Sequence, residues 1–219
     1  MSLKPKKKSD LKKIEEKMKV KASKMESMQH LPPYTMIVSE GIKTEPIYIK
    51  GLVNKVNEKY KNATGRNTQG LIRFVDSMIE QGKWNHYNKF WLMYDKDDFP
   101  LDNFDNTQFE AEARKKPQMA VAWSNESIEL WFLLYFEDYC SDNGRKQYIE
   151  KLNKYFDYSK KREDLYDILN SLGSQEEAKR RARKMYAEFV DAHVTSMSAM
   201  VPATRVFELV EELESYLEK

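Results

Sequence analysis

Short strand-like runs alternate with longer helical patterns through the middle of this chain, and this alternation restricts the fold more than any other feature of the sequence. Runs rich in β-branched, aromatic and aliphatic residues cover positions 34–38, 90–94 and 119–123. Their length and composition are typical of buried strands. Because strands that alternate with helices usually pair in parallel, the sequence predicts an α/β fold with a parallel-rich sheet and covering helices.

Helical patterns fill the segments between and after these runs. A helix is predicted to begin at Thr44-Glu45-Pro46, because proline is tolerated in a first turn. Residues 62–68 are predicted to form a loop. The other predicted helices cover residues 69–81, 106–116, 126–136, 145–156, 161–171, 175–191 and 204–217. Ser174 with Glu177 matches a capping box.

The predicted elements divide the chain into three parts. Residues 34–140 are predicted to form an α/β core, and residues 141–219 a helical C-terminal part of the same domain without obvious strands. Apolar residues three and four positions apart over residues 9–29 predict an amphipathic helix. Pro32 and Pro33 end this pattern, so residues 1–33 are predicted to be an appendage.

Basic charge is concentrated in this appendage. Residues 1–24 carry ten lysines and three acidic residues, so the rest of the chain is net negative although the formal net charge of the whole chain is +2. Lysines such as Lys6, Lys7 and Lys8 suit a nucleic-acid backbone or an acidic partner surface. A solvated, frayed terminus is the alternative interpretation.

Several classes of protein are disfavoured by composition. The single cysteine, Cys140, excludes an intramolecular disulfide and a cysteine-built zinc site, and the three histidines are scattered. The longest apolar run, residues 130–136, is too short to span a bilayer. The N-terminus lacks the apolar segment of a secretory signal. We therefore expect a protein of a reducing, cytosolic compartment with no membrane partner.

Acidic residues follow each of the three predicted strands. Glu40 follows the first, Asp95 and Asp97 follow the second, and Glu129 lies shortly after the third. Ligands of open α/β sheets bind at the carboxyl ends of the strands. Carboxylates that converge there repel one another unless a cation joins them, and hard oxygen ligands suit Mg²⁺ or Mn²⁺. The sequence therefore predicts a divalent metal site at this edge.

The arrangement of these residues indicates metal-assisted phosphoryl transfer. Asp95 and Asp97 point to the same side of an extended segment, so they can bind one ion or bridge two. Glu40 would serve as a ligand or proton shuttle, and Lys43 would contact a phosphate. Each feature alone has a simpler interpretation. The Asp-x-Asp can be a solvated turn, and Glu129 can be a structural carboxylate that caps a neighbouring element or pairs with an arginine.

Four blocks of the chain, in the same order, resemble the RloB family. They are residues 38–48, 94–99, 124–136 and 202–206, which read VSEGIKTEPIY, YDKDDF, SNESIELWFLLYF and PATRV. The resemblance covers roughly residues 34–210. The chain departs from the family pattern at residues 125–128, where Asn-Glu-Ser-Ile stands in place of Asn-Pro-Cys/Ser-Phe.

RloB-like proteins resemble the TOPRIM superfamily of primases, type II topoisomerases and nucleases, which implies a TOPRIM-like core. By this resemblance, Glu40 is the glutamate after the first strand, and Asp95 and Asp97 form the Asp-x-Asp motif. Glu45 and Glu129 match acidic positions on the first helix and on the apolar helix. The resemblance implies that these five residues are catalytic and that Glu40, Asp95 and Asp97 bind Mg²⁺ or Mn²⁺.

The resemblance also implies a role in antiphage defence. RloB-like genes accompany abortive-infection systems, often beside an ATPase of the ABC/SMC type. We therefore expect an effector nuclease that cleaves RNA such as tRNA, or DNA, with Lys43, Lys96 and the N-terminal lysines binding the nucleic acid. The alternative is a non-catalytic metal-binding or interaction module that docks on the partner ATPase.

Overall fold

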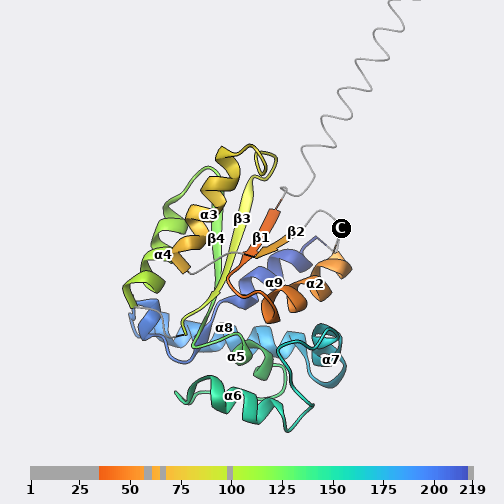
Figure 1. Ribbon diagram of the computed structural model, residues 1–219. Coiled ribbons are helices and arrows are strands. Elements are labelled where there is room, and N and C mark those ends of the chain that lie inside the picture. The colour runs from red at the N-terminus through yellow and green to blue at the C-terminus, as the bar shows by residue number, and fades with distance from the viewer. Residues whose placement is uncertain (1–34, 57–60, 65–67, 98–100, 217–219) are drawn as a thin grey trace, which may run out of the picture. The chain divides into compact units, whose positions relative to one another are not determined.

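The strands of the sheet bring three separate parts of the chain to one edge. The computed structural model describes residues 35–56, 61–64, 68–97 and 101–216, with backbone alone at 54–56, 61–64, 68–69 and 101–102. The strands are β1 (Thr35–Ser39), β2 (Lys61–Thr64), β3 (Lys89–Asp95), β4 (Gln118–Asn125) and β5 (Ala203–Thr204). In these residues the strand order is β2-β1-β3-β4-β5, with β1 to β4 parallel and β5 antiparallel to β4 (Figure 1). The predicted α/β fold with a parallel-rich sheet is confirmed.

Helices cover the sheet and extend beyond its carboxyl edge. They are α2 (Thr44–Val56), α3 (Thr68–Glu80), α4 (Leu101–Ala113), α5 (Glu129–Leu133), α6 (Gly144–Leu152), α7 (Leu165–Leu172), α8 (Gln175–Asp191) and α9 (Val206–Glu214). Figure 1 shows α3 and α4 on one side of the sheet and α2 and α9 on the other, with α5, α6 and α8 beyond the carboxyl ends of the parallel strands. The predicted covering helices and helical C-terminal region are confirmed.

The central strands are buried because helices pack on both faces. Ile37 of β1, Leu92 of β3 and Trp123 of β4 are fully buried, and burial of such a side chain contributes about 1.5–3 kcal/mol to folding. The indole N–H of Trp123 donates to Gln108 Oε1 at 2.6 Å, which satisfies its one polar group. The strand ends at the carboxyl edge are therefore held by a tightly packed core.

Two strands were missed, and several helix boundaries differ from the sequence prediction. Residues 62–68 were predicted to form a loop, but β2 occupies Lys61–Thr64 and α3 begins at Thr68. The polar strand β2 lacks an apolar alternation, and backbone pairing with β1 defines it. The C-terminal part showed no obvious strand in the sequence, but the two-residue β5 of this part pairs with β4. The helix predicted over 126–136 begins at Glu129, and the helix predicted over 106–116 begins at Leu101.

Local capping at α8 agrees with the sequence pattern. The Ser174 hydroxyl accepts a hydrogen bond from the Glu177 backbone N–H at 3.2 Å, as expected for a capping box. The predicted basic helix over residues 9–29, its end at Pro32 and Pro33, and the N-terminal lysines lie outside the described residues. Among the helices that are described, none has the length and apolarity needed to cross a membrane.

Candidate active site

Backbone hydrogen bonds extend past the ends of β1, β3 and β4. They hold the loops that follow these strands, which carry the acidic residues, next to one another. The Glu40 backbone N–H donates to the Met93 carbonyl at 2.8 Å. The Lys96 N–H donates to the Ser124 carbonyl at 2.9 Å, and the Asp97 N–H donates to the Glu126 carbonyl at 3.1 Å. The loops after β1, β3 and β4 are thus fixed side by side, so their acidic side chains face one region.

A cavity of about 260 Å³ opens at this edge. Its lining includes the acidic residues Glu45, Asp95, Asp97 and Glu129. It also includes the cationic residues Lys43, Arg145 and Lys160. Glu40 does not line the cavity, although its charge interacts with those of Glu45 and Arg145. The structure therefore gathers the acidic residues singled out in the sequence, and adds cations from the helical C-terminal part.

Glu129 is the most deeply buried of these carboxylates, with 1% of its side chain exposed. The Tyr158 hydroxyl donates to Glu129 Oε1 at 2.9 Å, and Lys160 Nζ lies 3.5 Å from the same oxygen. Glu129 Oε2 has no hydrogen-bond partner among the described residues. An incompletely satisfied carboxylate in such a buried position is costly for stability, which is typical of a functional group.

Burial and mutual repulsion raise the pKa values of Glu40, Glu45 and Asp95 at this edge. Burial raises the pKa of Asp95 well above its usual range, and the charges of Glu45 and Glu129 add to this effect. Burial likewise raises the pKa of Glu45, with the Glu129 charge as a further cause. The pKa of Glu40 is raised to about 7, mainly by burial. Each shift means that the folded protein disfavours these negative charges in the absence of a cation.

Gly41 leaves room for one of these carboxylates. A Cβ atom at this position would overlap the carboxyl group of Glu45, which is held in the first turn of α2. The Thr44 hydroxyl at the start of the same helix donates to the Lys160 carbonyl at 3.5 Å. The Glu-Gly pair after β1 therefore places the start of α2 against the loop that carries Tyr158 and Lys160.

Arg145 is the central cation of the site, and sequence reasoning missed it. Its guanidinium contacts Asp97, lies 3.5 Å from Asp95 Oδ2, and places Nε 3.5 Å from Glu129 Oε2. Its backbone N–H donates to Glu126 Oε2 at 3.4 Å, next to Gly144 with a φ of +71°. A single arginine at the start of a helix has no local signal of function. Neither do Tyr158 and Lys160, which approach Glu129 only through tertiary packing.

The lysines predicted to bind nucleic acid occupy different surroundings. Lys43 is exposed at the cavity. Lys96 Nζ donates to the Asp97 carbonyl at 3.1 Å, beside the Asp-x-Asp loop. Lys6, Lys7 and Lys8 lie outside the described residues. The structure thus places two of the predicted lysines at the acidic edge.

The donor chemistry of this edge suits a hard divalent ion, but the side chains are not yet arranged as a ligand set. Glu40 Oε2 and Glu129 Oε2 have no hydrogen-bond partner in the described part of the chain, and carboxylate oxygens are the ligands that Mg²⁺ and Mn²⁺ prefer. Within the same residues, no three Asp, Glu, His or Cys side chains are grouped to hold a metal ion. Arg145 lies among Asp95, Asp97 and Glu129, so its guanidinium occupies the space between them.

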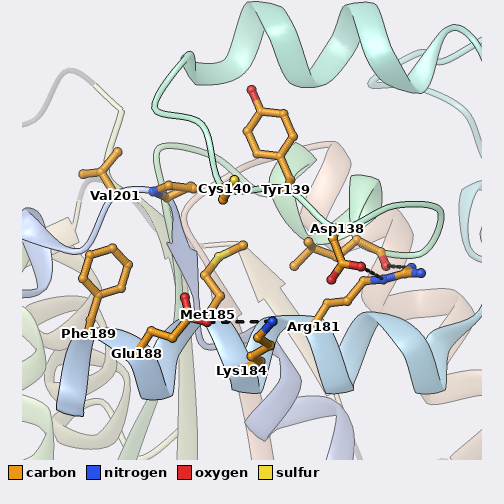
Figure 2. A pocket seen from close by; sticks show the side chains of 11 residues that line it. Asp138, Tyr139, Cys140, Arg181, Lys184, Met185, Glu188, Phe189 and Val201 are labelled. Carbon is orange, nitrogen blue, oxygen red and sulfur yellow. Dashed lines mark hydrogen bonds and ion pairs between the residues drawn. The ribbon is translucent and has the colours of Figure 1, made fainter. Parts of the chain in front are cut away.

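A second cavity, of about 290 Å³, provides a contrast (Figure 2). It lies between α8 and the segment that carries Asp138 and the exposed Cys140. Its charged side chains are paired: Arg181 lies 3.7 Å from Asp138, and Lys184 lies 3.9 Å from Glu188. Arg181 also donates to the Leu134 carbonyl at 2.7 Å. This cavity holds balanced charges rather than converging carboxylates, so the carboxyl edge of the sheet is the stronger candidate site.

Comparison with known proteins supports the resemblance seen in the sequence. No curated protein and no solved structure matches the chain. A family model described as RloB-like protein matches residues 35–213. This match begins at the first residue of β1 and ends one residue before the end of α9. The chain therefore belongs to the RloB-like protein family.

Proposed function

We propose that this protein is a nuclease that uses Mg²⁺ or Mn²⁺ to hydrolyse phosphodiester bonds. The observation that carries the proposal is the convergence of three buried carboxylates on a cavity that also has cationic side chains. They are Glu45 of α2, Asp95 at the end of β3 and Glu129 of α5. Carboxylates that bind metal and cations that bind phosphate are the two requirements of metal-assisted phosphoryl transfer. The TOPRIM-like character that the resemblance implies agrees with this chemistry.

The chain's own residues suggest a division of roles. Glu40, Asp95 and Asp97 would hold the ion, and Glu45 and Glu129 would complete the acidic environment. Lys43 and Lys160 lie at the same cavity and would orient a phosphate. Glu40, with a pKa of about 7, can accept a proton near neutral pH. When bound, the divalent ion would polarise the phosphate and lower the pKa of coordinated water.

The biological setting follows from the family resemblance rather than from the geometry. We propose RNA such as tRNA, or DNA, as the substrate, and an antiphage or abortive-infection system as the context. An ABC/SMC-type ATPase from the same locus is the proposed partner. The exposed Lys43 suits a phosphate backbone of either nucleic acid.

Metal binding is the first test, because it requires neither a substrate nor a partner. Mn²⁺ would be titrated by calorimetry into the wild type and into an Asp95→Asn/Asp97→Asn variant. The matched control is Asp76→Asn, since Asp76 also pairs with an arginine, Arg114, at 2.5 Å but lies outside the site. We expect binding to the wild type and the control, and its loss in the double variant.

Cleavage is the second test. RNA and DNA would be incubated with the same three proteins and Mn²⁺, with and without the ATPase encoded at the same locus. We expect divalent-dependent cleavage by the wild type and the Asp76→Asn control, and none by the double variant. Mn²⁺ binding or cleavage that survives in the double variant would refute the proposed site.

A non-catalytic interaction module is the second candidate function. One observation favours it: the described Asp, Glu, His and Cys residues include no ready group of three for a metal ion. In this case the acidic edge would dock on a basic surface of the partner ATPase. The Asp95→Asn/Asp97→Asn variant would then lose affinity for the ATPase, while the wild type would show no hydrolysis with any metal.

A further inference from the structure

Arg145 holds a position that a divalent ion would compete for. Its guanidinium contacts Asp97 and lies 3.5 Å from an oxygen of Asp95 and 3.5 Å from an oxygen of Glu129. One cationic group therefore bridges carboxylates from β3, from the loop after β3 and from α5. In the part of the chain that the structure describes, Arg145 Nε has no hydrogen-bond partner.

The charge balance explains why a cation belongs there. The buried titratable groups at this edge are acidic: Glu45, Asp95 and Glu129 are 6%, 7% and 1% exposed. Arg145 is 28% exposed, and its charge favours the ionised forms of Glu40, Glu45 and Asp95. Converging carboxylates need a counter-ion, and the chain supplies one from α6.

The backbone of Arg145 is anchored separately from its side chain. The backbone N–H of Arg145 donates to the Glu126 carboxylate, and a Cβ atom at Gly144 would overlap that same carboxylate. The start of α6 is thus fixed to the loop after β4. Because an arginine side chain has several rotatable bonds, its guanidinium can leave the carboxylates while the backbone stays in place.

From this geometry we propose that Arg145 is a tethered cation, which occupies the acidic cluster in the metal-free protein and competes with the divalent ion for Asp95, Asp97 and Glu129. The inference rests on the proposed function, since it assumes that an ion binds at this edge. It accounts for the lack of a ready ligand set among the described residues. Metal binding then requires the guanidinium to move away, so metal affinity is set partly by the chain itself.

The test compares Mn²⁺ affinity, measured by calorimetry, in Arg145→Gln and in two matched variants. Lys160→Gln removes a positive charge that lies 3.5 Å from Glu129 but does not bridge the aspartates. Lys146→Gln removes the neighbouring charge on α6, whose side chain is 89% exposed and pairs with Glu150. We expect Arg145→Gln to bind Mn²⁺ about tenfold more tightly than the wild type, and Lys160→Gln to change affinity about threefold or less. Lys146→Gln should match the wild type.

A second measurement separates competition from a merely structural role. In EDTA, Arg145→Gln should melt at a lower temperature than the wild type because the carboxylates lose their counter-ion. Mn²⁺ should then raise its melting temperature by more than it raises that of the wild type. If Arg145→Gln does not fold, Arg145→Lys keeps the charge but cannot bridge three carboxylates, and its Mn²⁺ affinity should also exceed that of the wild type.

The outcomes distinguish this inference from the proposed function. Unchanged or weaker Mn²⁺ binding in Arg145→Gln, with binding still lost in Asp95→Asn/Asp97→Asn, would overturn the tethered cation and leave the metal site intact. Equal gains in Arg145→Gln and Lys160→Gln would also overturn it, because net charge alone would then explain both. If none of the proteins binds Mn²⁺, both proposals fail.

Discussion

Two arginines of this protein face clusters of carboxylates, and the clusters differ in how completely their hydrogen bonds are made. Arg205, just before α9, donates through Nε and Nη2 to the two oxygens of Glu208 at 2.8 and 2.7 Å, and through Nη1 to Glu112 at 2.8 Å. Its guanidinium also lies 5.4 Å from the ring centre of Tyr186. Arg145 instead has long contacts of 3.5 Å to two of its carboxylates.

The difference separates a structural ion pair from a site prepared for a ligand. In the Arg205 cluster, the bidentate geometry matches the guanidinium to its partners and stabilises the fold. Around Arg145, several buried carboxylates share one guanidinium, and burial raises the pKa values of Glu45 and Asp95. Such an arrangement lowers the stability of the fold, and strained sites of this kind are typical of functional sites.

The largest effect on stability is expected at the well-paired cluster. Arg205→Gln would leave Glu208 and Glu112 without their partner, and the Arg205 side chain is only 14% exposed. We expect the free energy of unfolding to fall by about 3 kcal/mol, measured by urea denaturation. The control is Arg180→Gln, whose 53% exposed side chain pairs with Glu177 on the surface of α8. If the Arg205→Gln variant loses no more stability than Arg180→Gln does, the Arg205 cluster stabilises the fold no more than a surface ion pair, and it does not differ from the Arg145 cluster as argued.

A smaller loss is expected from Tyr158→Phe at the acidic edge. The variant removes the one hydrogen bond that Tyr158 donates to the buried Glu129 carboxylate, at 2.9 Å, and keeps the ring. We expect unfolding to become easier by about 2 kcal/mol. The control is Tyr155→Phe, whose hydroxyl donates to Glu137 at 2.7 Å in an exposed setting. Equal losses of stability in the two variants would show that a hydrogen bond to the buried Glu129 stabilises the fold no more than the more exposed one to Glu137.

A gain in stability, rather than a loss, is expected when a carboxylate that the fold disfavours is replaced by a neutral side chain. Asp95→Asn keeps the shape of the side chain and removes a buried carboxyl group. The pKa of this group is raised by burial and by the charges of Glu45 and Glu129. In EDTA at about pH 8, we expect the variant to be more stable than the wild type by about 1 kcal/mol. The matched variant Glu208→Gln at the Arg205 cluster should lose stability. A loss in both variants would mean that Asp95 acts as an ordinary ion-pair partner.

Sequence patterns predicted the parts of this molecule that depend on local periodicity. The strands β1, β3 and β4 were recognisable because each is a short apolar run, and the parallel topology brings Asp95, Asp97 and Glu129 to one cavity at the carboxyl edge. The polar strand β2 and the two-residue β5 were missed, because pairing with a neighbour defines them rather than their own composition.

The cationic half of the site could not be predicted in the same way. Arg145 lies 50 residues from Asp95 in the chain, and Tyr158 lies 29 residues from Glu129. These residues come from α6 and from the loop that follows it, and neither lies within a recognisable sequence motif. Only the packing of the helical part against the carboxyl edge brings them to the acidic residues.

The smallest expected effect is a pH dependence of stability that comes from Glu40. Burial raises its pKa from the usual 4.5 to about 7 in the folded protein. Between these two values the folded state therefore binds more protons at this group than the unfolded state does. Since the free energy of unfolding falls with pH wherever the native state holds more protons, Glu40 should make the protein less stable as pH rises from about 4.5 to about 7.

The measurement is urea denaturation in EDTA at several values between about pH 5 and pH 8, on the wild type and on Glu40→Gln. The variant cannot ionise at this position, so its stability relative to the wild type should increase as pH rises across this interval. The difference should be modest, because Glu40 is only partly buried and solvent screens its charge. A difference that stays constant with pH, or that shrinks as pH rises, would show that the folded protein tolerates the Glu40 charge without a cation. The carboxyl edge would then resemble the Arg205 cluster, where each charged side chain described has an ion-pair partner within the protein.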